Sequence, residues 1–163
     1  MRRALLIGSE VGGLTGVHRD VAVMDEVLRG HGFTTVVATR GDARADGIVA
    51  QLRALAADTS DGDAAVVYYS GHGGRVENPA AGAGLPRWLQ FIVPTDHADR
   101  SGERVRVVLA EELSLLQGEL TARTPNVTSI YDCCHSARMS RDAALVPRAL
   151  DGTSAASRDI RAE

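Results

Sequence analysis

The chain has 163 residues, of which 44% are hydrophobic and 24% charged, and its formal net charge is −3. This length suits one domain with its own core and argues against a two-domain enzyme or a disordered chain. No apolar run approaches the ~18 residues of a membrane span, and the slightly acidic balance does not suggest a nucleic-acid partner. The short apolar stretch after Arg2 and Arg3 fits a first strand better than a signal peptide.

Strands and helices are predicted to alternate along the chain. Continuous apolar or β-branched runs predict strands at 4–7, 34–38, 64–69, 89–93 and 127–131. Apolar residues at helical spacing predict three helices, striped by Val17, Val21, Met24 and Leu28, by Ile48, Leu52 and Leu55, and by Leu109, Leu113, Leu116 and Leu120. Residues 73–87, rich in Gly, Ala and Pro, are expected to form a loop, and residues 147–163 a mobile tail.

This alternation predicts an α/β fold with a mainly parallel central sheet and helices on both faces. Such sheets carry their chemistry at the carboxyl ends of the strands. Two polar segments follow strands in this way, Ser70-Gly71-His72-Gly73-Gly74 and Asp132-Cys133-Cys134-His135-Ser136. Both are therefore expected to open onto the same edge of the sheet.

A histidine and a cysteine at the ends of neighbouring strands can form a catalytic dyad. The thiol titrates near pH ~8.5, and an imidazole beside it can take its proton and later protonate a leaving amine. The backbone N–H groups of Gly73 and Cys134 are candidates for an oxyanion hole. Taken singly, a strand cysteine is more often a core residue and a histidine among glycines a turn residue. Side chains alternate along a strand, so one of Cys133 and Cys134 is expected in the core, and the residues alone leave open which.

Adjacent cysteines rarely form a disulfide with each other, because disulfide geometry is demanding. Cys133 and Cys134 therefore do not indicate a disulfide framework, and a reducing, cytoplasmic location is expected.

The two segments resemble the two motifs of the caspase-like cysteine peptidases, in their metacaspase branch, over roughly residues 3–140. The resemblance implies a three-layer caspase-like fold, with residues 1–140 as the large-subunit portion of the catalytic domain and 141–163 as a flexible tail or inter-subunit linker. It implies that His72 is the catalytic histidine and Cys134 the nucleophile, while Cys133 falls on a variable position. Ala137 departs from the glycine usual in the second motif.

The same resemblance places three residues in the substrate pocket: Asp20, Ser70 and Asp132. A buried carboxylate in a pocket favours a basic partner, which a guanidinium can pair with in bidentate fashion. The expected activity is therefore cleavage of proteins or peptides after Arg or Lys. Val17 departs from the cysteine that is usual in the family's loop before the first helix. Without the resemblance, Asp20 would be interpreted as a solvated helix residue and Asp132 as a turn or cap residue.

No cofactor is expected. Calcium needs several carboxylate or carbonyl oxygens, and the stretch where the family places acids, residues 77–84, holds one acid, Glu77. Asp96, Asp99 and Asp142 are scattered and are expected to be solvated charges. We therefore predict no dedicated calcium site.

Several other functions compete with this one. A metal site of His72, Cys133, Cys134 and His135 is disfavoured by the adjacent cysteines, and a phosphatase loop closed by Arg138 lacks its glycines. Gly12, Gly13 and Gly16 do not form a dinucleotide or phosphate-loop motif. The more serious rival is a weakly active or inactive scaffold that binds a partner.

The short stretch after Cys134 bears on the last rival. Caspase-like enzymes follow the cysteine motif with a smaller portion that completes the sheet, whereas residues 135–163 have the composition of a linker. A missing small-subunit fragment or a homodimer is therefore expected, with the last strand as an exposed edge. Arg148, Arg158 and Arg161 in the tail are candidate sites of self-cleavage.

Overall fold

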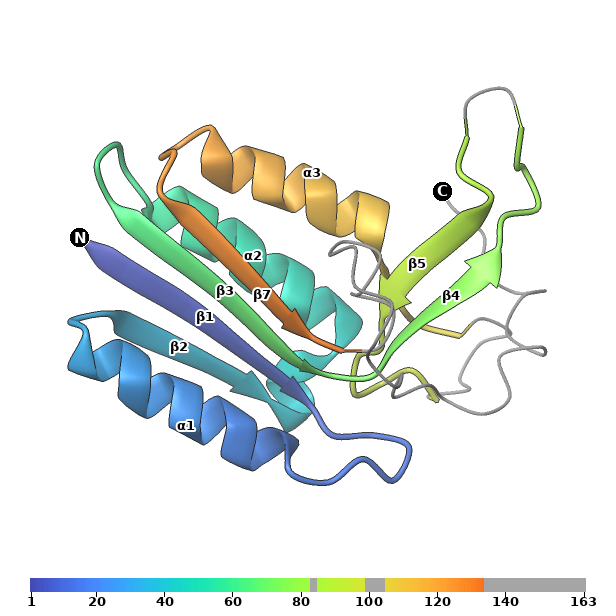
Figure 1. Ribbon diagram of the computed structural model, residues 1–163, viewed down its shortest axis with the longest axis horizontal. Helices are drawn as coiled ribbons and strands as arrows, with labels where there is room; N and C mark the ends of the chain where they lie inside the picture. The colour runs from blue at the N-terminus through green and yellow to red at the C-terminus, as the bar shows by residue number, and fades with distance from the viewer. Residues whose placement is uncertain (83–84, 99–104, 134–163) are drawn as a thin grey trace, which may run out of the picture.

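The computed structural model describes residues 1–82, 85–98 and 105–133. Strands and helices alternate through most of this part of the chain, as predicted (Figure 1). The elements are β1 (Arg2–Ser9), α1 (Val17–Gly30), β2 (Thr34–Thr39), the 3-10 helix η1 (Arg40–Ala43), α2 (Ala45–Asp58), β3 (Ala64–Gly71), β4 (Gly73–Glu77), β5 (Trp88–Ile92), β6 (Val108–Leu109), α3 (Ala110–Thr121) and β7 (Val127–Asp132).

The main sheet has four parallel strands in the order β2-β1-β3-β7. β1 and β3 lie at its centre, and both are buried over nearly their whole length, which explains their continuous apolar sequences. The predicted parallel sheet is thus confirmed. Because all four strands run the same way, their carboxyl ends meet at one edge.

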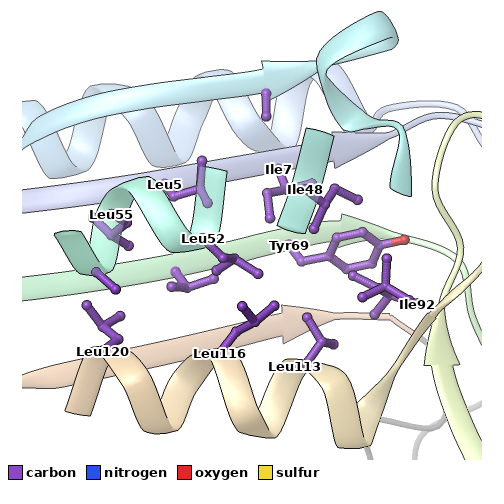
Figure 2. Close-up of a cluster of buried hydrophobic side chains, with 14 of the residues drawn as sticks. Leu5, Ile7, Ile48, Leu52, Leu55, Tyr69, Ile92, Leu113, Leu116 and Leu120 are labelled. Carbon is purple, nitrogen blue, oxygen red and sulfur yellow. The ribbon is translucent and has the colours of Figure 1, made fainter. Parts of the chain in front are cut away.

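Helices cover both faces of this sheet, as predicted, but unequally (Figure 1). α2 and α3 pack on one face, and their leucines meet the alternate residues of β1 and β3 in a large cluster (Figure 2). The buried members of this large cluster are Leu5, Ile7, Ala38, Ala43, Ile48, Leu52, Leu55, Ala56, Ala65, Val67, Tyr69, Ile92, Val108, Leu113, Leu116 and Leu120. On the other face, α1 is the only helix among the described residues, and it packs over a small cluster formed by Ala4, Leu6, Val21, Val66 and Tyr68.

A second sheet departs from the sequence prediction. Residues 73–77, expected as part of a loop, form β4, which pairs with β5 in an antiparallel sheet of order β4-β5-β6. The composition of this segment does not predict a strand, and its extended structure comes from pairing with β5. Gly74 lies directly under the Phe91 ring, where an added Cβ would come within 2.5 Å of it. This side sheet lies beyond the carboxyl ends of β3 and β7 (Figure 1).

Asp96 is buried, contrary to the expectation of a solvated charge. Its Oδ1 accepts a hydrogen bond at 2.9 Å from the N–H of Ala45, the first residue of α2. Its Oδ2 accepts one from Arg106 Nη1 at 2.8 Å and lies 3.6 Å from Arg44 Nη2. Burial opposes ionisation, but these hydrogen bonds and charges outweigh it and lower the pKa of Asp96. The carboxylate therefore caps α2 from a segment far away in sequence. Asp99 and Asp142 lie outside the described residues.

Among the helices of residues 1–82, 85–98 and 105–133, none combines the length and apolar character needed to cross a membrane.

Candidate active site

The carboxyl edge of the main sheet brings the two sequence motifs together. β3 and β7 pair in parallel with Ser70 opposite Asp132, so the residues that follow each strand emerge side by side. Ser70 and Asp132 share a sheet face with Tyr68 and Ile130, because side chains alternate along both strands. This is the face that carries α1. The expectation that both motifs open on one edge is met as far as Cys133.

Asp20 reaches the same corner from α1. It lies in the first turn of the helix, where the positive end of the helix dipole favours a carboxylate. Its Oδ2 accepts a hydrogen bond from the Ser70 hydroxyl at 3.2 Å. Ser70 is buried, Asp20 is half-buried and Asp132 is exposed. The three residues expected in the substrate pocket therefore occupy one corner of the sheet, two of them in direct contact.

His72 follows β3 directly and is 7% exposed. Neither Nδ1 nor Nε2 of its imidazole has a hydrogen-bond partner among the described residues, although both atoms are buried. A buried polar group without a partner costs free energy, and a catalytic role is one of the reasons for which native structures keep such a group. The imidazole is thus held at the strand edge with both nitrogens uncommitted.

The backbone around His72 is held on several sides. The carbonyl oxygen of His72 accepts the N–H of Val93 at 3.0 Å and lies 2.8 Å from the hydroxyl of Tyr69. Gly71 precedes the histidine at a point where an added Cβ would come within 2.9 Å of the Ser9 carbonyl oxygen, so only glycine fits there without a shift. Sequence reasoning missed Tyr69, which reads as part of an apolar run.

Gly73 has a backbone N–H that points away from β5. Val93 donates to the carbonyl of His72, which makes this the hydrogen-bonded pair, and such pairs alternate with non-bonded ones along antiparallel strands. Gly73 and Ile92 are the next pair and therefore the non-bonded one. Because β4 is the edge of the side sheet within the described residues, this N–H faces outward from the edge.

Cys133 is half-buried and packs against the large cluster, on the opposite sheet face from Asp132. It thus occupies the core position expected for one of the two cysteines. Cys134, the predicted nucleophile and second oxyanion donor, lies outside the described residues, as do His135, Ala137 and the predicted tail.

His97 is a second histidine near this edge, and no sequence pattern singled it out. Burial lowers its pKa, and the nearby charge of His72 acts in the same direction, while the Pro94 carbonyl and Asp96 act against them. Its Nδ1 is buried without a hydrogen-bond partner among the described residues.

Residues 77–82 and 85–87, around the stretch where the family places acids, form a hairpin connection held by side-chain contacts. Glu77 ends β4 and lies 3.5 Å from Arg87, and both side chains are largely exposed. The side chain of Asn78 shapes the following turn, donating to the Pro86 carbonyl at 2.8 Å and accepting the Ala80 N–H at 3.0 Å. The described residues contain no group of three or more His, Cys, Asp or Glu side chains arranged to hold a metal ion.

Comparison with known proteins agrees with this architecture. A family model for the caspase domain of peptidases matches residues 1–160. The crystal structure of protein GSU0716 from Geobacter sulfurreducens is similar in fold, with a TM-score of 0.65 and 20% sequence identity, over 83% of this chain and 51% of that one. The chain thus spans about half the length of that structure. No curated protein sequence matches.

Proposed function

The chain belongs to the caspase-domain family, and from that premise we propose that it is a cysteine endopeptidase with His72 and Cys134 as its dyad. The observation that carries the proposal is the buried imidazole of His72 at the edge where β7 leads into the cysteine motif, with neither nitrogen hydrogen-bonded to any described residue. The position of Cys133 against the large cluster supports Cys134 as the reactive cysteine, because successive side chains of a strand alternate.

In the proposed reaction, His72 takes the proton of the Cys134 thiol, and the sulfur attacks the carbonyl carbon of the scissile peptide. The tetrahedral intermediate collapses to a thioester when His72 delivers that proton to the leaving amine. Water, deprotonated by His72, then hydrolyses the thioester. The outward N–H of Gly73 supports its role as one oxyanion donor, and the N–H of Cys134 is proposed as the other.

The proposed specificity is for Arg or Lys before the scissile bond, as in the metacaspase branch. The contact between Asp20 and Ser70 and the register position of Asp132 support it, because they gather two carboxylates at the corner beside His72. Ser70 orients Asp20, leaving its other oxygen for a guanidinium or ammonium group.

Labelling with a peptide chloromethyl ketone ending in Arg tests the dyad. Cys134→Ala and His72→Ala should abolish labelling and peptide cleavage, whereas the matched variant Cys133→Ala should retain both. Labelling that survives Cys134→Ala would contradict the assignment.

Fluorogenic peptides that differ only in the residue before the scissile bond test the specificity. Wild type should cleave after Arg and Lys but not after Asp, and Asp20→Asn should lower kcat/KM for the Arg peptide at least about tenfold, since it removes a charged partner. Preferred cleavage after Asp would overturn this part of the proposal.

We further propose that activity needs no dedicated calcium site. The commitment of Glu77 and Asn78 to the hairpin between β4 and β5 supports this. Activity should survive dialysis against EDTA and should not rise strictly with added calcium. A strict calcium requirement would contradict the proposal.

An alternative is that the domain is a scaffold that is weak or inactive until a partner completes it. The observation that favours it is β7, which is an edge strand of the main sheet within the described residues and exposes Thr128 and Ile130. A small-subunit fragment or a second copy would cover this edge. Intact mass and sedimentation of the purified protein, set beside its activity, distinguish a lone inactive chain from an assembled enzyme.

A further inference from the structure

Tyr69 lies at the point where the large cluster meets the catalytic edge. Its side chain is 0% exposed and sits on β3, three residues before His72. Figure 2 shows its ring beside Ile92, with the hydroxyl pointing toward the carboxyl ends of the strands. A phenylalanine would fill this core position without a polar group that needs a hydrogen-bond partner. Packing alone therefore does not explain the hydroxyl of Tyr69.

That hydroxyl contacts two backbone carbonyls, one in the residue that follows β3 and one in the residue that follows β5. Its oxygen lies 2.8 Å from the carbonyl oxygen of His72 and 2.9 Å from that of Val93. A tyrosine hydroxyl has one hydrogen to donate, which these two acceptors share. The contact therefore ties the end of β3 to the segment after β5, at the residue that carries the imidazole.

The backbone is shaped around this hydroxyl. An added Cβ at Gly71 would lie 2.5 Å from it, so the chain passes too close for any other residue. Burial raises the pKa of Tyr69 well above its ordinary value. The hydroxyl therefore stays protonated, and remains a donor, throughout the pH range in which a cysteine peptidase works.

We propose that Tyr69 is a positioning residue of the active site, whose hydroxyl fixes the backbone of His72 and thereby aims both the imidazole and the N–H of Gly73. This inference rests on the proposed peptidase function. It adds that the large cluster, through Tyr69, sets the geometry of the reacting groups. Small displacements of such groups cost about 100-fold in rate, so the effect should fall on kcat.

Tyr131 provides a matched comparison. Its ring packs against that of Tyr69, with centroids 6.5 Å apart, but its hydroxyl accepts a hydrogen bond from Gln117 Nε2 on α3 at 2.7 Å. Tyr69→Phe and Tyr131→Phe each remove one hydroxyl and keep the ring, and only the first touches His72.

Steady-state kinetics on an Arg peptide, thermal unfolding and amide hydrogen exchange, measured on the full chain, test the proposal. Tyr69→Phe should lower kcat about 10- to 100-fold with KM changed less than about twofold, and Tyr131→Phe should lower it less than about threefold. The amide of Val93, which donates to the His72 carbonyl, should exchange at least about tenfold faster in Tyr69→Phe only.

Equal losses of kcat in the two variants, or a lowered melting temperature in Tyr69→Phe with unchanged kcat and unchanged exchange at Val93, would overturn the proposal. If the wild type shows no Cys134-dependent cleavage, the peptidase function fails. Exchange at Val93 then decides by itself whether Tyr69 anchors this backbone.

Discussion

The two faces of the main sheet differ in the size of the apolar cluster that covers them. The face under α2 and α3 is closed over β1 and β3 by the large cluster, which runs from the amino end of the sheet to Tyr69 and Ile92. At its edges, Val36 on β2 and Ser129 on β7 are exposed. The face under α1 carries the small cluster over β1 and β3, and α1 also lies beside β2. On β7 this face exposes Thr128, Ile130 and Asp132. The polar corner of Asp20 and Ser70 lies on this second face. Most of the buried apolar residues thus lie on one face, and the polar corner lies on the other.

The largest expected effect comes from opening the closed face. Leu116→Ala should lower the free energy of unfolding by about 2–5 kcal/mol, because the side chain is 3% exposed and leaves a cavity. The neighbour Leu115, 73% exposed on the same helix, is the control, and its change to Ala should have little effect. Urea denaturation measures both. Equal losses would mean that α3 does not close this face as described.

Asp96→Asn should have the next largest effect, about 1–3 kcal/mol at neutral pH, because it weakens a buried charged cap on α2. The pKa of Asp96 is lowered in the folded state, so its contribution is present above the unfolded value near ~3.9 and is lost as pH falls through the folded value. The difference between wild type and variant should therefore shrink below about pH 4.

The exposed Asp46, in the first turn of the same helix, is the control for that experiment. Asp46→Asn should cost only a few tenths of a kcal/mol, as expected for a charge near a helix dipole (about 0.3–1 kcal/mol). A pH-independent difference between wild type and Asp96→Asn would show that the ionised carboxylate is not the stabilising group.

Ser70→Ala should lower the free energy of unfolding by about 0.5–1.5 kcal/mol, because it removes the one hydrogen bond from the buried Ser70 hydroxyl to Asp20. A double-mutant cycle with Asp20→Asn isolates the contact from other effects of each change. Strictly additive losses would show that the two side chains are not coupled.

The smallest effect is expected on the open face. Ile130 is 37% exposed, and Ile130→Ala should change the free energy of unfolding by no more than about 0.5 kcal/mol. A loss above about 2 kcal/mol, measured at several protein concentrations, would show that something covers this face in solution. The contrast between the two faces would then need revision.

Much of the fold can be predicted from the sequence, because buried parallel strands are continuous apolar runs and helices show their stripes. β4 escapes prediction because it begins with two glycines, and its order comes from pairing with β5. Asp96 escapes for a similar reason. The N–H that it caps belongs to Ala45, 51 residues away, and no local sequence pattern predicts a contact over that separation.

The candidate site divides in the same way. The nearness of Ser70 and Asp132 follows from the rule that parallel strands end together. Only the resemblance to a known family places Asp20 and Ser70, 50 residues apart, in one site, and it does not predict the hydrogen bond between them. Tyr69 has partners that are backbone carbonyls, which leave no trace in the sequence.

The glycines beside His72 have an evolutionary consequence. Gly71 is pressed against Tyr69 and Gly74 against Phe91, so both are required by packing whether or not the protein cleaves anything. The histidine between them is under no such steric demand. A relative that has lost catalysis while keeping the fold should therefore retain the glycines and vary at the histidine. Under the proposed mechanism, the glycines of this motif report descent and the imidazole reports activity.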